Sequence, residues 1–163
     1  MALGKRKDAT QQPLFVVTAD LPSLRPNPFY EAVNKVLAEH DFDRYVEGLC
    51  AKFYDDANMG RPGLPPGVYV RCLLVGYFEG LDSERGIAWR CGDSRSLGLF
   101  LGYAIDEPTP DHSTISRTRR LIDLETHQEV FAHVLKVLAG QGLIDGKTIG
   151  VDGTTLEANA ALR

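Results

Sequence analysis

The sequence predicts a mainly α-helical protein: a compact multi-helix domain with one short β-strand after it. Apolar residues recur three or four positions apart through most of residues 27–142. β-like patterns occur only at 14–18 and at 148–152, the latter entered from an Asp-Gly turn. The 163 residues are 44% hydrophobic and 25% charged, which excludes wholesale disorder and allows a core without disulfides or metals.

The first two helices are predicted by capping residues followed by apolar faces. Asn27 can cap a helix whose first position is Pro28, with apolar side chains along one face. Asp41 can cap a second helix, residues 42–53, which repeats the pattern and carries acidic side chains on its polar face. We expect the two helices to form a hairpin.

A third helix is expected to lie at the centre of the core. Helix-breaking residues fill 60–67 and predict a loop that separates two helical layers. Residues 68–78 are then apolar nearly all round, and Arg71 and Glu79 are the clear polar exceptions. A helix with apolar residues on every side is typical of a buried position.

The following segments predict two short helices and one long one. Asp82 or Ser83 can open a helix that ends at Trp89, and residues 94–101 form another short candidate. Near the end, apolar residues mark one face of a strongly amphipathic helix that glycines 140 and 142 close; they are Val130, Phe131, Val134, Leu135 and Leu138.

Composition excludes several classes of protein. The three cysteines have no metal or disulfide spacing and indicate reduced thiols, and no segment is long and apolar enough for a signal peptide or a membrane span, so we expect a cytoplasmic protein. The four histidines have no zinc-ligand spacing, and no glycine-rich phosphate loop is present. The net charge of −4 means that any contact with a polyanion must be local.

Residues 109–120 combine hydroxyl groups with clustered positive charge. We expect Thr109 and Pro110 to open a helix with Asp111 in its first turn, in a helix-turn-helix-like part of the domain. Its candidate contacts with phosphates or bases are His112, Ser113, Thr114, Ser116, Arg117, Arg119 and Arg120. Arg85 and Arg90 of the 83–89 helix are supporting or competing candidates. The alternative is a solvated helix face whose arginines pair with acids such as Asp123.

Asp152 follows the predicted 148–152 strand. A carboxylate at the end of a strand can bind a divalent metal when other carboxylates join it. The alternative is an ordinary Asp-Gly turn without chemistry.

Taken in order, several segments resemble bacterial insertion-sequence transposases of the DDE type, with a helical N-terminal domain ahead of an RNase H-like catalytic domain. The resemblance covers nearly the whole chain and includes Arg117, Arg119 and the segments GRP (60–62), LVGYFEG (74–80), DSERGI (82–87), FLG (100–102), TPDHST (109–114) and GVDGTTLEANAA (150–161).

The resemblance implies three parts: an extended segment (1–26), a helical domain that binds the terminal inverted repeats of the element and helps dimerisation (27–142), and the start of an RNase H-like domain (143–163). It implies that Asp152 is the first catalytic and Mg²⁺-binding residue. The second Asp and the Glu of such enzymes lie far downstream and are not in this sequence, so we expect this chain alone to be catalytically incomplete and to bind Mg²⁺ poorly.

Three interpretations follow. The first is a transposase fragment, from a truncated, frameshifted or split gene, that retains DNA binding and dimerises or pairs with full-length transposase. The second is a helical protein–protein interaction module that pairs with intact transposase and inhibits it. The third is the product of a decayed reading frame, whose unpaired strand at 148–152 favours aggregation.

Overall fold

The computed structural model describes residues 26–54 and 63–141, which form seven α-helices, one short 3-10 helix and no β-strand. The mainly α-helical prediction is therefore confirmed for this part of the chain. The predicted strand at 148–152, with Asp152, and the β-like run at 14–18 lie outside the described residues.

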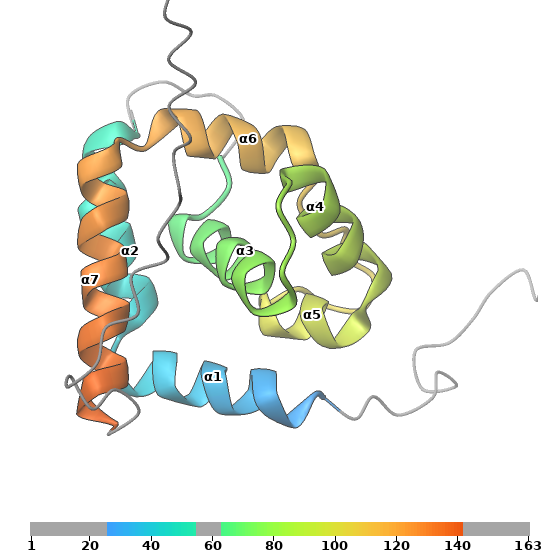
Figure 1. Cartoon of the computed structure of the whole chain (residues 1–163). Helices are drawn as coiled ribbons and strands as arrows, with labels where there is room; N and C mark the ends of the chain where they lie inside the picture. Colours follow the sequence, from blue (N-terminus) through green and yellow to red (C-terminus); the bar gives the residue numbers. More distant parts are fainter. Residues whose placement is uncertain (1–25, 55–62, 142–163) are drawn as a thin grey trace, which may run out of the picture.

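The helices surround a central one (Figure 1). Their bounds are α1 Pro28–Glu39, α2 Phe42–Cys50 with a 3-10 turn at Ala51–Phe53, α3 Pro66–Glu79, α4 Glu84–Asp93, α5 Arg95–Phe100, α6 His112–Leu121 and α7 Leu124–Gly140. Helix α3 contacts α2, α4 and α6, and α7 lies beside α2 at the edge of the molecule.

Two of the predicted helix caps, Asn27 and Ser83, are confirmed. The side chain of Asn27 accepts a hydrogen bond from the backbone N–H of Phe29, and Pro28 occupies the first helical position of α1. Ser83 caps α4 and Ser94 caps α5 in the same way. Each of these side chains satisfies a backbone N–H that the helix leaves free.

Other predicted helix starts are wrong. Asp41 precedes α2 but adopts the left-handed conformation (φ 48°) and makes no side-chain cap, because it makes the tight turn from α1 into α2. Helix α6 begins at His112, since Asp111 rather than Thr109 is its cap: the Asp111 carboxylate accepts from the Thr114 N–H at 2.8 Å. Helix α3 includes the last two residues of the predicted 60–67 loop, with Pro66 as its first residue.

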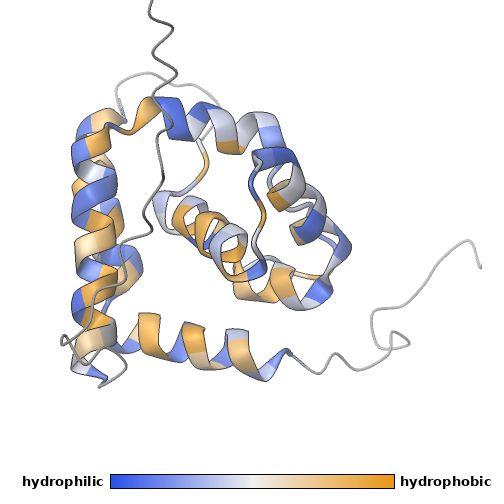
Figure 2. Ribbon diagram, viewed as in Figure 1, coloured by the Kyte–Doolittle hydropathy of each residue, from blue (hydrophilic) through white to orange (hydrophobic). Residues whose placement is uncertain are grey.

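The core forms around α3, as the sequence predicts (Figure 2). Tyr69, Cys72 and Val75 are fully buried, and all three cysteines of the chain are free, buried thiols. The last turn of the helix differs from the prediction, because Tyr77 is 81% exposed. A second difference is that Arg71 is buried with the apolar residues.

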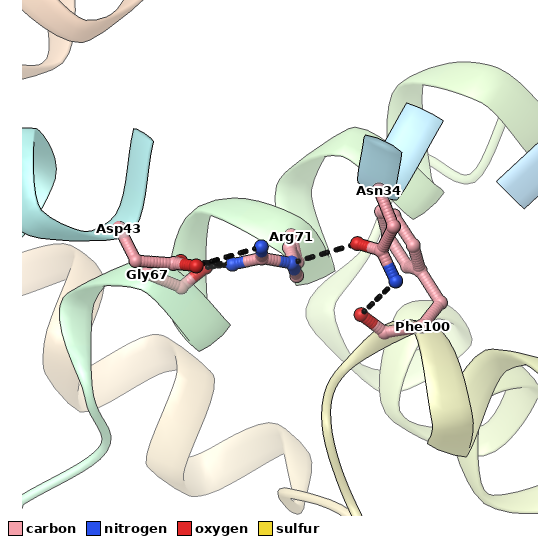
Figure 3. A network of polar contacts seen from close by, with 5 residues as sticks. All are labelled: Asn34, Asp43, Gly67, Arg71 and Phe100. Carbon is pink, nitrogen blue, oxygen red and sulfur yellow. Dashed lines mark hydrogen bonds and ion pairs between the residues drawn. The ribbon is translucent and has the colours of Figure 1, made fainter. Parts of the chain in front are cut away.

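Arg71 joins four helices through polar contacts (Figure 3). Its guanidinium forms a two-pronged ion pair with Asp43 of α2 and donates to the side-chain oxygen of Asn34 on α1 at 3.3 Å. Asn34 in turn donates to the backbone oxygen of Phe100 at the end of α5. A buried charge is costly unless it is paired, so this network fixes how α1, α2 and α5 meet α3.

Helix α7 packs on α2 through an aromatic pair. The rings of Tyr45 and His133 stack with their centroids 4.0 Å apart. His133 Nε2 is buried and has no hydrogen-bond partner among the described residues. Burial lowers the pKa of His133, and the positive charges of His40 and Lys136 lower it further.

Candidate nucleic-acid interface

Helix α6 is fixed to the domain by one apolar face. Ile115 is fully buried, and Thr118 is buried with its hydroxyl donating to the backbone oxygen of Thr114 at 3.0 Å. These residues face α4 and α3, which α6 contacts. The opposite side of α6 is therefore left to solvent and is largely polar (Figure 2).

That solvent side brings together several of the predicted DNA-binding residues. Arg117 donates to the backbone oxygen of Ser113 at 3.2 Å and to its hydroxyl at 3.3 Å. One turn later, Arg120 donates to the backbone oxygen and hydroxyl of Ser116 at 3.3 and 3.2 Å. Neither arginine forms an ion pair with a carboxylate in the described part of the chain. We call the side chains of Ser113, Ser116, Arg117 and Arg120 the arginine face.

The start of α6 is less suited to an anion than the sequence indicated. The Asp111 carboxylate accepts from the Ser113 hydroxyl at 2.7 Å and from the Thr114 N–H, and these bonds lower the pKa of Asp111 to about 2. The negative charge there already occupies the N-terminal donors of the helix. His112 is exposed beside it. Phosphate is therefore better placed at the arginine face than at the first turn.

Arg119 has a different role from its two neighbours. It forms an ion pair with Glu84 of α4 at 2.5 Å. The pKa of Glu84 is lowered, first by its own backbone hydrogen bond at the start of α4 and then by Arg119. The alternative interpretation, in which the arginines pair with acids, therefore holds for Arg119, but its partner is Glu84 and not Asp123. Asp123 instead caps α7 and pairs with Lys52.

The two candidate DNA-binding residues on α4, Arg85 and Arg90, also differ in their contacts. Arg90 forms an ion pair with Glu79 at 2.5 Å, and Tyr30 donates to the same carboxylate at 2.9 Å. Burial and this hydrogen bond raise the pKa of Tyr30. Arg90 therefore ties α4 to α3 and α1. Arg85 is exposed and has no ion pair among the described residues, so it is available to a ligand.

The sequence did not predict the hydrogen-bond network of Arg71 or the ion pair between Arg90 and Glu79. The available signal for the first was a single arginine in an otherwise apolar helix, since a buried arginine requires a carboxylate nearby. The carboxylate, Asp43, lies 28 positions away along the chain, where no local pattern marks it.

The described residues hold no group of three His, Cys, Asp or Glu side chains that is placed to bind a metal ion. None of the described helices has both the length and the apolar composition that crossing a bilayer requires.

Comparison with known proteins supports the resemblance stated above. The model of the family described as "Transposase domain (DUF772)" matches residues 20–121, well over half of the chain, and its last matched residue is the last residue of α6. No curated protein and no solved structure matches the chain. With the arginine face and the helices that hold it inside the matched span, the chain belongs to the transposase domain family DUF772.

Proposed function

We propose that this helical region binds duplex DNA at the terminal inverted repeats of an insertion sequence, as the DNA-binding part of a DDE-type transposase, and that the arginine face of α6 makes the contact. The observation that carries the proposal is the pair of exposed arginines, Arg117 and Arg120, without carboxylate partners in the described part of the chain. Membership of the transposase family supports it.

The local chemistry suits a phosphate backbone. Arginine presents a planar fork of donors that matches phosphate oxygens. The hydrogen bonds that Arg117 and Arg120 make to their own helix are exposed, so exchanging them for phosphate contacts costs little. The residues from His112 to Ile122 include no acid, so the chain's net charge of −4 does not repel DNA at this surface directly.

The test is the salt dependence of binding to duplexes tiled across the DNA on either side of the gene, with scrambled duplexes as reference. Losing one phosphate contact should lower the magnitude of the log K against log salt slope by about 0.9. We expect this for Arg117→Ala and Arg120→Ala and no change for Arg44→Ala, an exposed arginine on the acidic helix α2. Equal slopes in all of these variants would place the DNA contact elsewhere.

The resemblance also supports a catalytic role for Asp152 with Mg²⁺ in a complete enzyme. We assign no metal chemistry to the described helices. If a purified sample of this chain nicks element-end DNA with Mg²⁺, and Asp152→Ala abolishes that activity, the expected catalytic incompleteness is wrong.

A second candidate function is pairing with intact transposase subunits, which would inhibit transposition. Large apolar side chains exposed on α7 favour it. Co-elution of this chain with a full-length relative tests it, and separate elution at every ratio would contradict it.

A further inference from the structure

Two of the three cysteines of the chain lie against each other between α3 and α4. Cys72 of α3 and Cys91 of α4 are both fully buried, and their thiols hydrogen-bond to each other. The third, Cys50, is buried on α2. Two thiols in contact can be joined by a disulfide when the backbones that carry them are also close.

The packing of α3 on α4 brings the two backbones close at this pair. A Cβ at Gly76 would lie 2.7 Å from Cδ1 of Ile87, so the absence of a side chain at Gly76 lets the two helices approach. Cys72 lies one turn before Gly76, and Cys91 lies one turn after Ile87. Residues four positions apart share a helix face, so both cysteines lie on the faces that meet.

Cys91 borders a hollow in the surface of the domain. The hollow has a volume of about 80 Å³, and its lining includes Cys91, the exposed Arg95 and Tyr103. Of the three cysteines, Cys91 is the one among its lining residues. A water molecule needs about 15 Å³ of such space, so the hollow admits an oxidant as small as hydrogen peroxide.

The surroundings of Cys91 favour its thiolate, which is the form that reacts with a peroxide. The hydrogen bond from Cys72 lowers the pKa of the Cys91 thiol by more than burial and the charge of Glu79 raise it. For Cys50, burial instead raises the pKa. Cys91 is therefore the thiol that we expect to react first.

We propose that Cys91 and Cys72 form an oxidisable dithiol, a site at which hydrogen peroxide, or another small hydroperoxide, produces a disulfide between α3 and α4. The Cys91 thiolate attacks one peroxide oxygen: an S–O bond forms, the O–O bond breaks, hydroxide leaves, and Cys91 becomes a sulfenic acid. The Cys72 sulfur then attacks the Cys91 sulfur: the S–S bond forms, the S–O bond breaks, and the hydroxyl leaves with the thiol proton as water. The two thiols together lose two electrons, which the peroxide gains. This inference concerns thiol chemistry and does not rest on DNA binding.

Peptide mapping of the full chain after peroxide treatment tests the proposal. Trypsin cuts after lysine and arginine and places the three cysteines on separate peptides, residues 45–52, 72–85 and 91–95. We expect peptides 72–85 and 91–95 to appear as one linked species, while Cys50 still takes up a thiol label after denaturation. A link that includes Cys50, or a disulfide between two chains, would overturn the proposal. Three free thiols at a peroxide dose that oxidises the chain in urea would also overturn it.

Two matched variants test the order of the steps. In Cys72→Ala the sulfenic acid of Cys91 has no thiol partner, so dimedone, which traps sulfenic acids, should label peptide 91–95. Cys50→Ala is the control and should form the link as fast as the parent. Dimedone on Cys50 rather than on Cys91 in the first variant, or loss of the link in the second, would contradict the assigned roles.

The size of the oxidant tests the route to Cys91. Cumene hydroperoxide carries a phenyl ring and is too large for the hollow, so it should form the link at least about tenfold more slowly than hydrogen peroxide does. The ratio of the two rates in urea, where every thiol is accessible, corrects for the reactivity of the two oxidants. Equal corrected rates would show that oxidants enter by opening of the fold, and the hollow would then have no part in the reaction.

Discussion

Replacing Asp43 by alanine is expected to destabilise the fold more than replacing its partner, Arg71, by methionine. The Arg71 side chain is 11% exposed, whereas that of Asp43 is 49% exposed. Without Asp43, the acceptors that the buried guanidinium keeps among the described residues are neutral ones, on Asn34 and Gly67. Without Arg71, the Asp43 carboxylate can be hydrated at the surface, and methionine fills much of the arginine stem's space.

The exposed fractions of the Arg71 and Asp43 side chains determine how much stability each substitution is expected to remove. Breaking a fully buried ion pair costs about 3–5 kcal/mol. Because water reaches the Asp43 side, we expect Asp43→Ala to lower the free energy of unfolding by about 2 kcal/mol, and Arg71→Met by about 1 kcal/mol. The double variant should lose about 1 kcal/mol, because the methionine removes the unpaired charge that Asp43→Ala leaves behind.

Urea unfolding followed by far-UV circular dichroism measures these differences. The distinctive expectation is rescue: the double variant is more stable than Asp43→Ala alone. If Arg71→Met restores no stability to Asp43→Ala, or if all three variants stay within about 0.5 kcal/mol of the parent, the network does not hold the helices together as argued.

Three further outcomes are expected. A Cβ at Gly76 would lie 2.7 Å from Cδ1 of the buried Ile87, so Gly76→Val should cost about 2 kcal/mol in urea unfolding, whereas Gly48→Val, with no neighbour within 4 Å, should cost clearly less. The pKa of Asp111 falls from 3.8 to about 2 in the fold, so its stabilisation is complete above about pH 4 and is lost as pH falls towards 2; a Tm series should show this loss in the parent and not in Asp111→Asn. Burial lowers the pKa of His133, so the fold prefers the neutral ring, and stability should fall as pH drops below about 6.5; His133→Phe should flatten that part of the profile, and an unchanged slope would contradict the assignment.

Local sequence signals predicted most of the helices but not their polar connections. The caps at Asn27 and Ser83 were predictable because each side chain bonds a backbone N–H only two or three residues away. At α6, Thr109 was the predicted cap because Pro110 follows it, and that prediction was wrong. The structure shows that Asp111 is the cap.

The candidate site was predictable as a segment but not residue by residue. Charge and hydroxyl pattern indicated α6, yet only packing separates Arg119, which pairs with Glu84 on α4, from Arg117 and Arg120, which face solvent. Arg90 was similarly indistinguishable from Arg85 until α4 was placed against α3. Such long-range pairs leave no periodic trace in a sequence, because they depend on how helices pack.

Fluorescence anisotropy over a salt series measures directly whether α6 contacts DNA. For element-end duplex, we expect the Arg117→Ala/Arg120→Ala double variant to have a log K against log salt slope smaller in magnitude than the parent's by about 1.8, whereas Arg44→Ala should keep the parent's slope. If the double variant binds with the parent's affinity and slope, the arginine face is a solvated helix surface that does not contact DNA.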